Sequence, residues 1–213
     1  MELSERNNAH KGVRITRLPS TVLLLAANPL QLPPLRLGEE CRTIHEMIRK
    51  AKFRDQVQFV SEWAARRDDL LQVLNDHAPS VLHFSGHGSG GQGLCFQADD
   101  GTARSISTDD LARVICAAGQ SLMIVVLNAC YTEGQARKLA KHVPCVVGMS
   151  GRIGDEAAIE YTRSFYRALA SGRSAADAHT HKALLRLSIN RKLTKHEIST
   201  GGSGNREWKP PNY

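Results

Sequence analysis

The sequence predicts an α/β fold, with a mostly parallel central sheet and helices on both faces. Short, nearly continuous apolar runs recur along the chain, as in 21–27 and 123–127, and such runs are typical of buried parallel strands. Segments of helical length lie between most of these runs, so each connection is long enough to be a crossover between parallel strands. A chain of 213 residues is long enough for one such domain with a real core.

The individual elements follow from the same patterns. Strands are expected at 21–27, 56–60, 80–85, 94–96, 103–106, 123–128 and 145–149, and helices at 37–52, 66–77, 108–118, 133–142, 153–170 and 174–189. Asp100-Gly101 is a strong turn signal and favours a hairpin between the fourth and fifth of these strands. Ser107-Thr108 favours a helix start, and Asp109 suits the positive first turn of that helix.

The ends of the chain differ from its middle in charge. The formal net charge is +7, of which +2 lies in 1–20 and +4 in 186–213, leaving +1 for 21–185. We expect an N-terminal arm at 1–20, one domain at 21–190 and a flexible basic tail at 191–213. A nucleic-acid-binding domain normally carries its basic stripe on the folded part, so we interpret the excess as solvated tails and expect no direct nucleic-acid partner.

Composition also restricts the cellular setting. No apolar run approaches the ~20 residues of a membrane span, so no membrane association is expected. Residues 1–8 are polar and charged, unlike a secretory signal. The five cysteines form no C-x-x-C pair and no metal-ligand spacing, which predicts a reducing, cytoplasmic location and no disulfide or zinc framework.

Two reactive side chains follow strand ends. His87 comes after the expected strand 80–85, and Cys130 comes directly after 123–128. Reacting groups in an open α/β sheet gather beyond the carboxyl ends of parallel strands, so these two side chains would form a thiol–imidazole pair. Gly86 and Gly88 on either side of the histidine allow a sharp turn and a close approach of substrate. A free cysteine alone is more often a small buried hydrophobe, so the pairing carries the argument.

The motifs Ser85-Gly86-His87-Gly88, Leu127-Asn128-Ala129-Cys130 and Asp155-Glu156-Ala157-Ala158 carry a family resemblance. Over about 21–187 the chain resembles the caspase–hemoglobinase clan of cysteine peptidases, most closely its bacterial CHAT-domain branch, with separases and metacaspases as relatives. Cys130 follows His87 by 43 residues, close to the roughly 50-residue spacing of caspases. The resemblance implies a caspase–hemoglobinase-like sandwich and a cysteine endopeptidase that acts on a protein substrate and needs no metal or cofactor.

The resemblance also implies roles for single residues. Backbone N–H groups of Gly88 and Cys130 would form the oxyanion hole. Asp155, with Glu156 beside it, would line a pocket for a basic side chain at P1, the substrate residue before the cleaved bond. Ser85 and Asn128 would flank the same pocket, although metacaspases commonly have aspartate where Asn128 stands. Asp155 and Glu156 equally suit the start of a helix, and both interpretations stay open.

Control is expected to come from outside the catalytic residues. The family usually joins or partners its protease domain with a sensor, which implies a separately encoded activating or regulatory protein and a role in bacterial defence or cell-death signalling. The glycine-rich loop 88–93 and the hairpin around 99–104 are expected to be mobile until ordered, which would make the chain a latent protease. Arg104 in the hairpin and Arg191 in the tail are candidate activation cuts.

Two alternatives remain. A catalytically silent protease-like domain that serves as a protein-binding scaffold would keep the fold without the reaction. Gly86-His87-Gly88-Ser89-Gly90-Gly91 also fits the G-x-G-x-x-G pattern of a dinucleotide- or flavodoxin-like nucleotide-binding domain. That pattern requires a helix to begin at once, whereas 94–97 is expected to be a strand.

Overall fold

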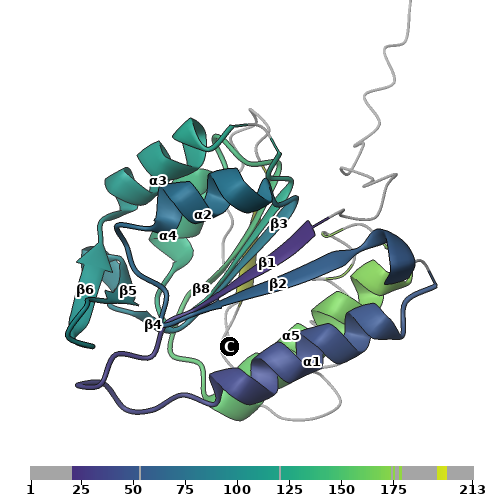
Figure 1. The fold of residues 1–213 in the computed structure, drawn as a ribbon, viewed down its shortest axis with the longest axis horizontal. Coiled ribbons are helices and arrows are strands. Elements are labelled where there is room, and N and C mark those ends of the chain that lie inside the picture. Colours follow the sequence, from purple (N-terminus) through teal and green to yellow (C-terminus); the bar gives the residue numbers. More distant parts are fainter. Residues whose placement is uncertain are drawn as a thin grey trace, which may run out of the picture.

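A computed structural model describes residues 21–52, 54–119, 121–173, 175, 178 and 196–200. Its centre is a six-stranded sheet in the order β2-β1-β3-β7-β8-β9, lying between two layers of helices (Figure 1). The strands are β1 (Thr21–Ala26), β2 (Gln58–Trp63), β3 (Val81–Ser85), β7 (Ile124–Asn128), β8 (Cys145–Met149) and β9 (His196–Thr200). The first five are parallel and β9 is antiparallel to β8, which confirms the expected fold class.

Each face of the sheet is covered by its own helices. On one face lie α2 (Leu70–His77), α3 (Thr108–Ala117) and α4 (Glu133–Leu139), and on the other lie α1 (Leu37–Arg49) and α5 (Asp155–Ala170) (Figure 1). Side chains alternate between the two cores along β1, with Leu23 facing the first and Leu24 the second. Both faces of a parallel strand are therefore apolar, which is why these strands appear in the sequence as continuous hydrophobic runs.

A second, smaller sheet extends from the carboxyl ends of the main strands. It has the order β4-β5-β6, formed by β4 (His87–Gly88), β5 (Leu94–Gln97) and β6 (Ala103–Ile106), all antiparallel. The β5–β6 hairpin turns through Gly101, whose φ of 79° suits glycine. Ser107 then starts α3 by accepting the N–H of Asp110 at 3.1 Å, so the hairpin and the helix cap are both confirmed.

The structure differs from the sequence expectations at several boundaries. β2 begins two residues later than expected because Arg54–Gln56 forms a 3₁₀ turn, and α2 begins at Leu70 rather than at 66. Residues 196–200, which we assigned to the tail, form β9. The arm 1–20 and most of the helix expected at 174–189 lie outside the described residues.

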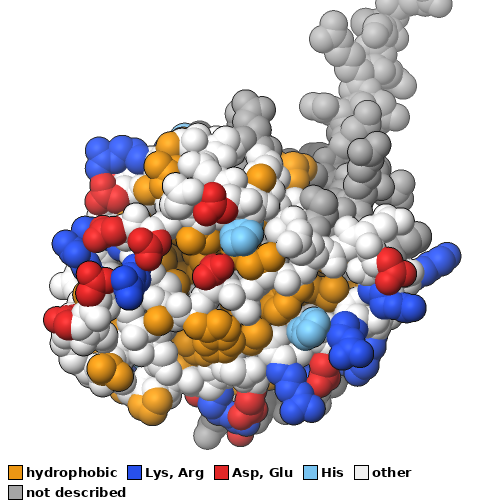
Figure 2. All heavy atoms as spheres, in the orientation of Figure 1, with side chains coloured by type: hydrophobic (Ala, Val, Ile, Leu, Met, Phe, Trp, Pro, Cys, Tyr) orange, Lys and Arg blue, Asp and Glu red, His pale blue; other side chains and the backbone are white. Residues whose placement is uncertain are grey.

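Charged groups of both signs are confined to a few regions of the visible surface. On the face in Figure 2 they gather at the left over β5, β6 and α3 and at the lower right along α1, with hydrophobic side chains exposed between these regions. Within the described residues, each helix is too short or too polar to cross a membrane.

Candidate active site

The sheet register brings His87 and Cys130 to the same edge. β3 and β7 are parallel neighbours, and Ser85 lies opposite Asn128 at their carboxyl ends. His87 follows Ser85 by two residues, and Cys130 follows Asn128 by two. All four residues line one pocket at this edge. The expected nucleophile and the expected base thus occupy equivalent positions beyond two adjacent strands.

Gly88 sets how closely the histidine loop approaches the cysteine loop. A Cβ atom added to Gly88 would lie 2.1 Å from the carbonyl oxygen of Cys130, well inside van der Waals contact. The other side of the histidine loop is fixed by β4, where His87 lies opposite Cys95 of β5. The two loops can therefore lie this close together only because glycine at position 88 has no side chain.

A backbone carbonyl orients the imidazole of His87. Nε2 lies 3.0 Å from the carbonyl oxygen of Pro33, and because a carbonyl only accepts, Nε2 carries a proton in this contact. In the neutral ring, Nδ1 then keeps the free lone pair and is the atom that can accept a thiol proton. Pro33 belongs to the loop between β1 and α1, which is tied to the hairpin by the N–H of Leu30 donating to Gly101 O at 3.0 Å.

The half-buried thiol of Cys130 lies beside the loop that leads into α5. The N–H of Ile153 is 3.5 Å from Sγ and points at the sulfur. The next residue, Tyr131, has a φ of 56°, a left-handed conformation that turns the chain away from β7 toward α4. Its N–H donates to Gly151 O at 3.2 Å, so the turn is anchored to the same loop as the sulfur.

A buried threonine anchors the cysteine turn to the core. Thr132 is fully buried, and its hydroxyl lies 3.1 Å from Leu127 O and 3.0 Å from Ala129 O. The same hydroxyl accepts the N–H of Met149 in β8 at 2.9 Å. The turn that carries Cys130 is therefore attached through Thr132 both to the end of β7 and to β8.

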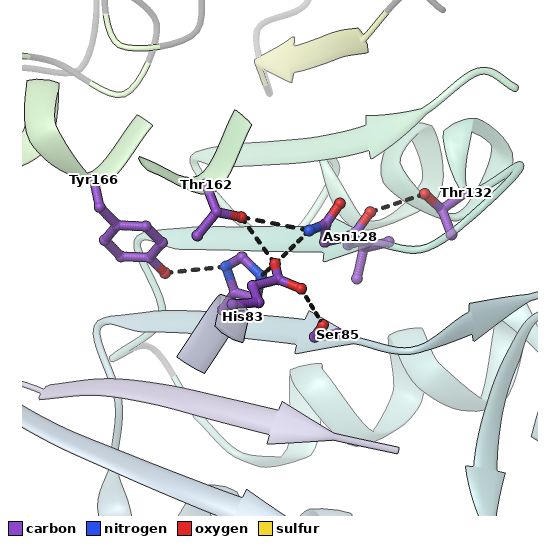
Figure 3. Close-up of polar contacts among 8 residues, drawn as sticks. His83, Ser85, Asn128, Thr132, Thr162 and Tyr166 are labelled. Carbon is purple, nitrogen blue, oxygen red and sulfur yellow. Dashed lines mark hydrogen bonds and ion pairs between the residues drawn. The ribbon is translucent and has the colours of Figure 1, made fainter. Parts of the chain in front are cut away.

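The pocket is also lined by a buried carboxylate that the sequence analysis missed. Glu40 of α1 is 4% exposed and lines the pocket with the residues named above. Four side chains donate to it: Nε2 of His83 and Oγ1 of Thr162, each at 2.8 Å from Oε1, Nδ2 of Asn128 to the same oxygen, and Oγ of Ser85 to Oε2. Figure 3 shows these polar contacts converging between β3, β7 and α5.

Burial and hydrogen bonding act on the pKa of Glu40 in opposite directions. Burial raises it, but the hydrogen bonds and charge of His83 and the hydrogen bonds of Ser85 and Asn128 outweigh burial, so the pKa lies below its ordinary value. Glu40 is therefore ionised at neutral pH. The sequence did carry a signal, because Glu40 occupies the buried face of α1 between Leu37 and Ile44, where an apolar residue is expected.

The two acidic residues at the start of α5 differ in their position relative to the pocket. Asp155 lines the pocket, and its Oδ2 accepts the N–H of Arg36 at 3.2 Å, at the residue where α1 starts. Glu156 is exposed and is not among the residues that line the pocket. Asp155 thus has a pocket position and a structural contact at once, so both interpretations of this residue remain.

Of the two candidate activation cuts, Arg104 is described by the structure and is not among the residues that line the pocket. Arg104 is on β6, opposite Phe96, and its guanidinium lies 3.2 Å from the carboxylate of Asp68. Arg191 lies outside the described residues. Among the residues that the structure describes, no group of three or more His, Cys, Asp or Glu side chains is placed to hold a metal ion. The glycine pattern at 86–91 leads into strand β5, so the helix that a dinucleotide site requires does not follow it.

Comparison with known proteins identifies the family and several relatives of this chain. The profile of the CHAT domain family matches residues 4–196. A Roc-COR-CHAT protease from an unknown prokaryotic organism is 26% identical over 195 residues, which cover 83% of this chain and 18% of the relative. A probable protease of Gillisia limnaea is 22% identical over 153 residues, covering 71% of this chain and 27% of that protein. The chain thus spans less than a third of either curated relative.

A solved structure shares the fold. A secreted C11 cysteine protease from Bacteroides thetaiotaomicron, determined with an irreversible peptide inhibitor, superposes with a TM-score of 0.62 over 85% of this chain and 66% of that one. The sequence identity is 11%, so this likeness concerns the fold alone.

Proposed function

Because the chain belongs to the CHAT domain family, whose curated relatives are named as proteases, we propose that it is a cysteine endopeptidase with Cys130 as nucleophile and His87 as general acid and base. One observation carries the proposal: the two residues extend two parallel, adjacent strands by the same number of positions and line one pocket. A cysteine and a histidine arranged in this way form the pair required for nucleophilic peptide hydrolysis.

The reaction follows from the tautomer that Pro33 imposes. Nδ1 of His87 takes the thiol proton as Sγ of Cys130 attacks the peptide carbonyl, and the protonated ring then delivers that proton to the leaving amine. Water, deprotonated by His87, hydrolyses the thioester. We assign the oxyanion hole to the N–H groups of Gly88 and Cys130, because Gly88 lies against the Cys130 backbone and donors so placed stabilise the developing negative charge.

The pocket beside this pair is proposed to take a basic P1 side chain. Asp155 lies on its wall, and Ser85 and Asn128 lie two residues before the catalytic pair. Glu156 does not line the pocket, so it would contribute to binding a basic P1 side chain only through its charge at longer range. A carboxylate in such a pocket pairs with a guanidinium or an ammonium through charge-assisted hydrogen bonds.

Control is proposed to act through the hairpin. β5 pairs with His87, and the hairpin turn at Gly101 binds the loop that carries Pro33. A partner protein, or a cut at Arg104 or Arg191, that moved the hairpin would therefore move both the backbone and the ring contact of His87. Such control suits an effector in bacterial defence or cell-death signalling.

The experiment is a positional peptide library read with the wild type, Cys130→Ala and His87→Ala. Each variant is expected to lose cleavage while keeping the wild-type melting temperature, and the double variant to be little worse than either. Cleavage by Cys130→Ala at near the wild-type rate would refute the assignment. A folded wild type that cleaves no peptide, even after nicking, and whose Cys130 is not labelled by a thiol-reactive peptide, would indicate a silent scaffold instead.

A further inference from the structure

We propose that His83 is a positioning residue: through Glu40 it holds the ends of β3 and β7 together, and so sets the spacing of the proposed catalytic pair. The proposal rests on the peptidase function proposed above and adds to it a residue that touches no substrate. His83 lies in the middle of β3, is completely buried and is not among the residues that line the pocket. Its influence on the reaction is therefore exerted through a neighbouring side chain.

Glu40 connects the last residues of the two strands that lead to the pair. Ser85 ends β3 and Asn128 ends β7, and the two lie opposite each other in the sheet. Both donate to Glu40, Oγ of Ser85 to Oε2 and Nδ2 of Asn128 to Oε1. His87 and Cys130 follow these strand ends by two residues each. A carboxylate that binds both strand ends from α1 therefore limits how far the two loops beyond them can move apart.

The ion pair with His83 keeps Glu40 able to bind both strand ends. Nε2 of His83 lies 2.8 Å from Oε1 of Glu40, and their side chains are 0% and 5% exposed. Burial raises the pKa of Glu40, and the hydrogen bond and charge of His83 are the largest of the effects that lower it. An ionised carboxylate accepts through both oxygens, whereas a protonated one gives up part of that capacity to become a donor. The contacts to Ser85 and Asn128 thus depend on His83.

Helix α5 fixes the orientation of the His83 ring. Nδ1 of His83 lies 3.2 Å from the hydroxyl of Tyr166, and Thr162, one turn earlier on α5, donates to Oε1 of Glu40 at 2.8 Å. Burial raises the pKa of Tyr166, so its hydroxyl keeps a proton and can both donate and accept. Nε2–H therefore points to Glu40 whether or not the ring is protonated. Figure 3 shows the contacts that run from Tyr166 through His83 to Ser85.

Other ionisable groups lie near Glu40 within the cluster, on its own helix and across the pocket. They are His83 and Tyr166 in the cluster, Arg36 and Glu39 at the start of α1, and His87, Cys130 and Asp155 in the pocket lining. Arg36 is paired with Glu39 where both are about half exposed, so water and salt screen that pair. In the contacts described, His83 is the member of this set that donates to Glu40. Removing its charge should therefore raise the pKa of Glu40.

The variant His83→Gln keeps a donor for Glu40 but removes the charge of the ring. Val81→Ala is the matched control, because Val81 is buried on the same face of β3, two residues earlier, and does not line the pocket. The double variant Glu40→Gln/His83→Gln removes the carboxylate that would titrate, and so tests whether the effect of His83 passes through Glu40. Thr162→Val removes a different donor and replaces His83→Gln if that variant does not fold.

The measurement is kcat from pH 8 to pH 5 on a cleaved peptide, normalised to the amount of reactive Cys130 so that unfolded protein is not counted. His83→Gln is expected to lower kcat by about ten- to a hundredfold with KM nearly unchanged, because a displacement of the reacting groups affects the chemical step. The ratio of variant to wild-type kcat should fall further as the pH decreases and Glu40 becomes protonated. Thr162→Val should act in the same direction to a smaller extent.

The controls separate positioning from a merely structural role. The double variant should show a ratio that does not change with pH, and Val81→Ala should keep the wild-type kcat throughout. A ratio for His83→Gln that is independent of pH is the result of a merely structural role and overturns the proposal. A pH dependence that persists in the double variant also overturns it. If His83→Gln does not fold, wild-type kcat at every pH in Thr162→Val has the same meaning.

Alkylation of Cys130 by iodoacetamide distinguishes failure of this inference from failure of the peptidase function. If the wild type cleaves no peptide and is alkylated no faster than His87→Ala, the peptidase function itself fails. If the wild type is alkylated faster than His87→Ala, and His83→Gln is alkylated as fast as the wild type, the catalytic pair stands and the role of His83 is refuted. Slower alkylation in His83→Gln than in Val81→Ala is the expected result.

Discussion

The contact between Gly88 and Cys130 leads to a quantitative prediction about Gly88→Ala. The new Cβ would lie 2.1 Å from Cys130 O, whereas ordinary contact begins at 3.4 Å, so the two loops must separate by more than 1 Å. Gly88 has no left-handed φ, and the cost therefore comes from steric contacts, chiefly this one, with Cγ2 of Thr132 also close at 3.2 Å. A displacement of about 1 Å between reacting groups lowers catalysis by about a hundredfold, and overpacking of this kind costs about 1–3 kcal/mol of unfolding free energy.

Gly91→Ala is the matched control, because a Cβ at that position meets no atom within 4 Å. The assay is kcat/KM on a cleavable peptide, with the unfolding free energy from denaturant titration. We expect Gly88→Ala to be folded and about a hundredfold slower, and Gly91→Ala to behave as the wild type. Wild-type kcat/KM in Gly88→Ala, or an equal loss in both variants, would show that the spacing of these loops does not limit the reaction.

Three further predictions concern stability and thiol chemistry. The folded-state pKa of Glu40 lies below its ordinary value of 4.5, so its stabilising contribution is present above that pH and is lost as the pH falls through the folded pKa. Denaturant titrations from pH 7 to pH 3 should therefore show a smaller acid-induced loss of unfolding free energy in Glu40→Gln than in the wild type. Burial raises the pKa of the Cys145 thiol to about 11. Iodoacetamide at pH 8 should therefore modify the exposed Cys116 in the native protein and leave Cys145 unmodified until the protein unfolds, as measured by peptide mass spectrometry. Rapid labelling of Cys145 in the native protein would contradict its burial. Thr132→Val leaves the N–H of Met149 without its acceptor and should cost about 1–3 kcal/mol of unfolding free energy, and a stability equal to the wild type would show that another group replaces the hydroxyl.

The elements nearest the site illustrate what local sequence determines. The strand before Cys130 is a continuous apolar run, because a parallel strand packs helices on both faces, and its position therefore follows from the sequence. The Asp-Gly turn before β6 and the Ser107 cap depend on hydrogen bonds or torsions within a few residues, and both are found as expected. The start of β2 was placed less well, because a 3₁₀ turn and a strand compete over the same polar stretch before it.

The class of fold, most of the strands, and the presence of a histidine and a cysteine just beyond two of those strands all follow from local sequence patterns. The surroundings of these two residues depend on how distant segments pack: the carbonyl of Pro33 on the imidazole, the carbonyl of Cys130 against Gly88, and the carboxylate of Glu40 in the lining of the pocket. Periodicity and turn signals report interactions between residues close in the chain. The donors to Glu40 lie 43 to 122 residues away from it along the sequence, and only the packing of α1 and α5 on the sheet brings them together.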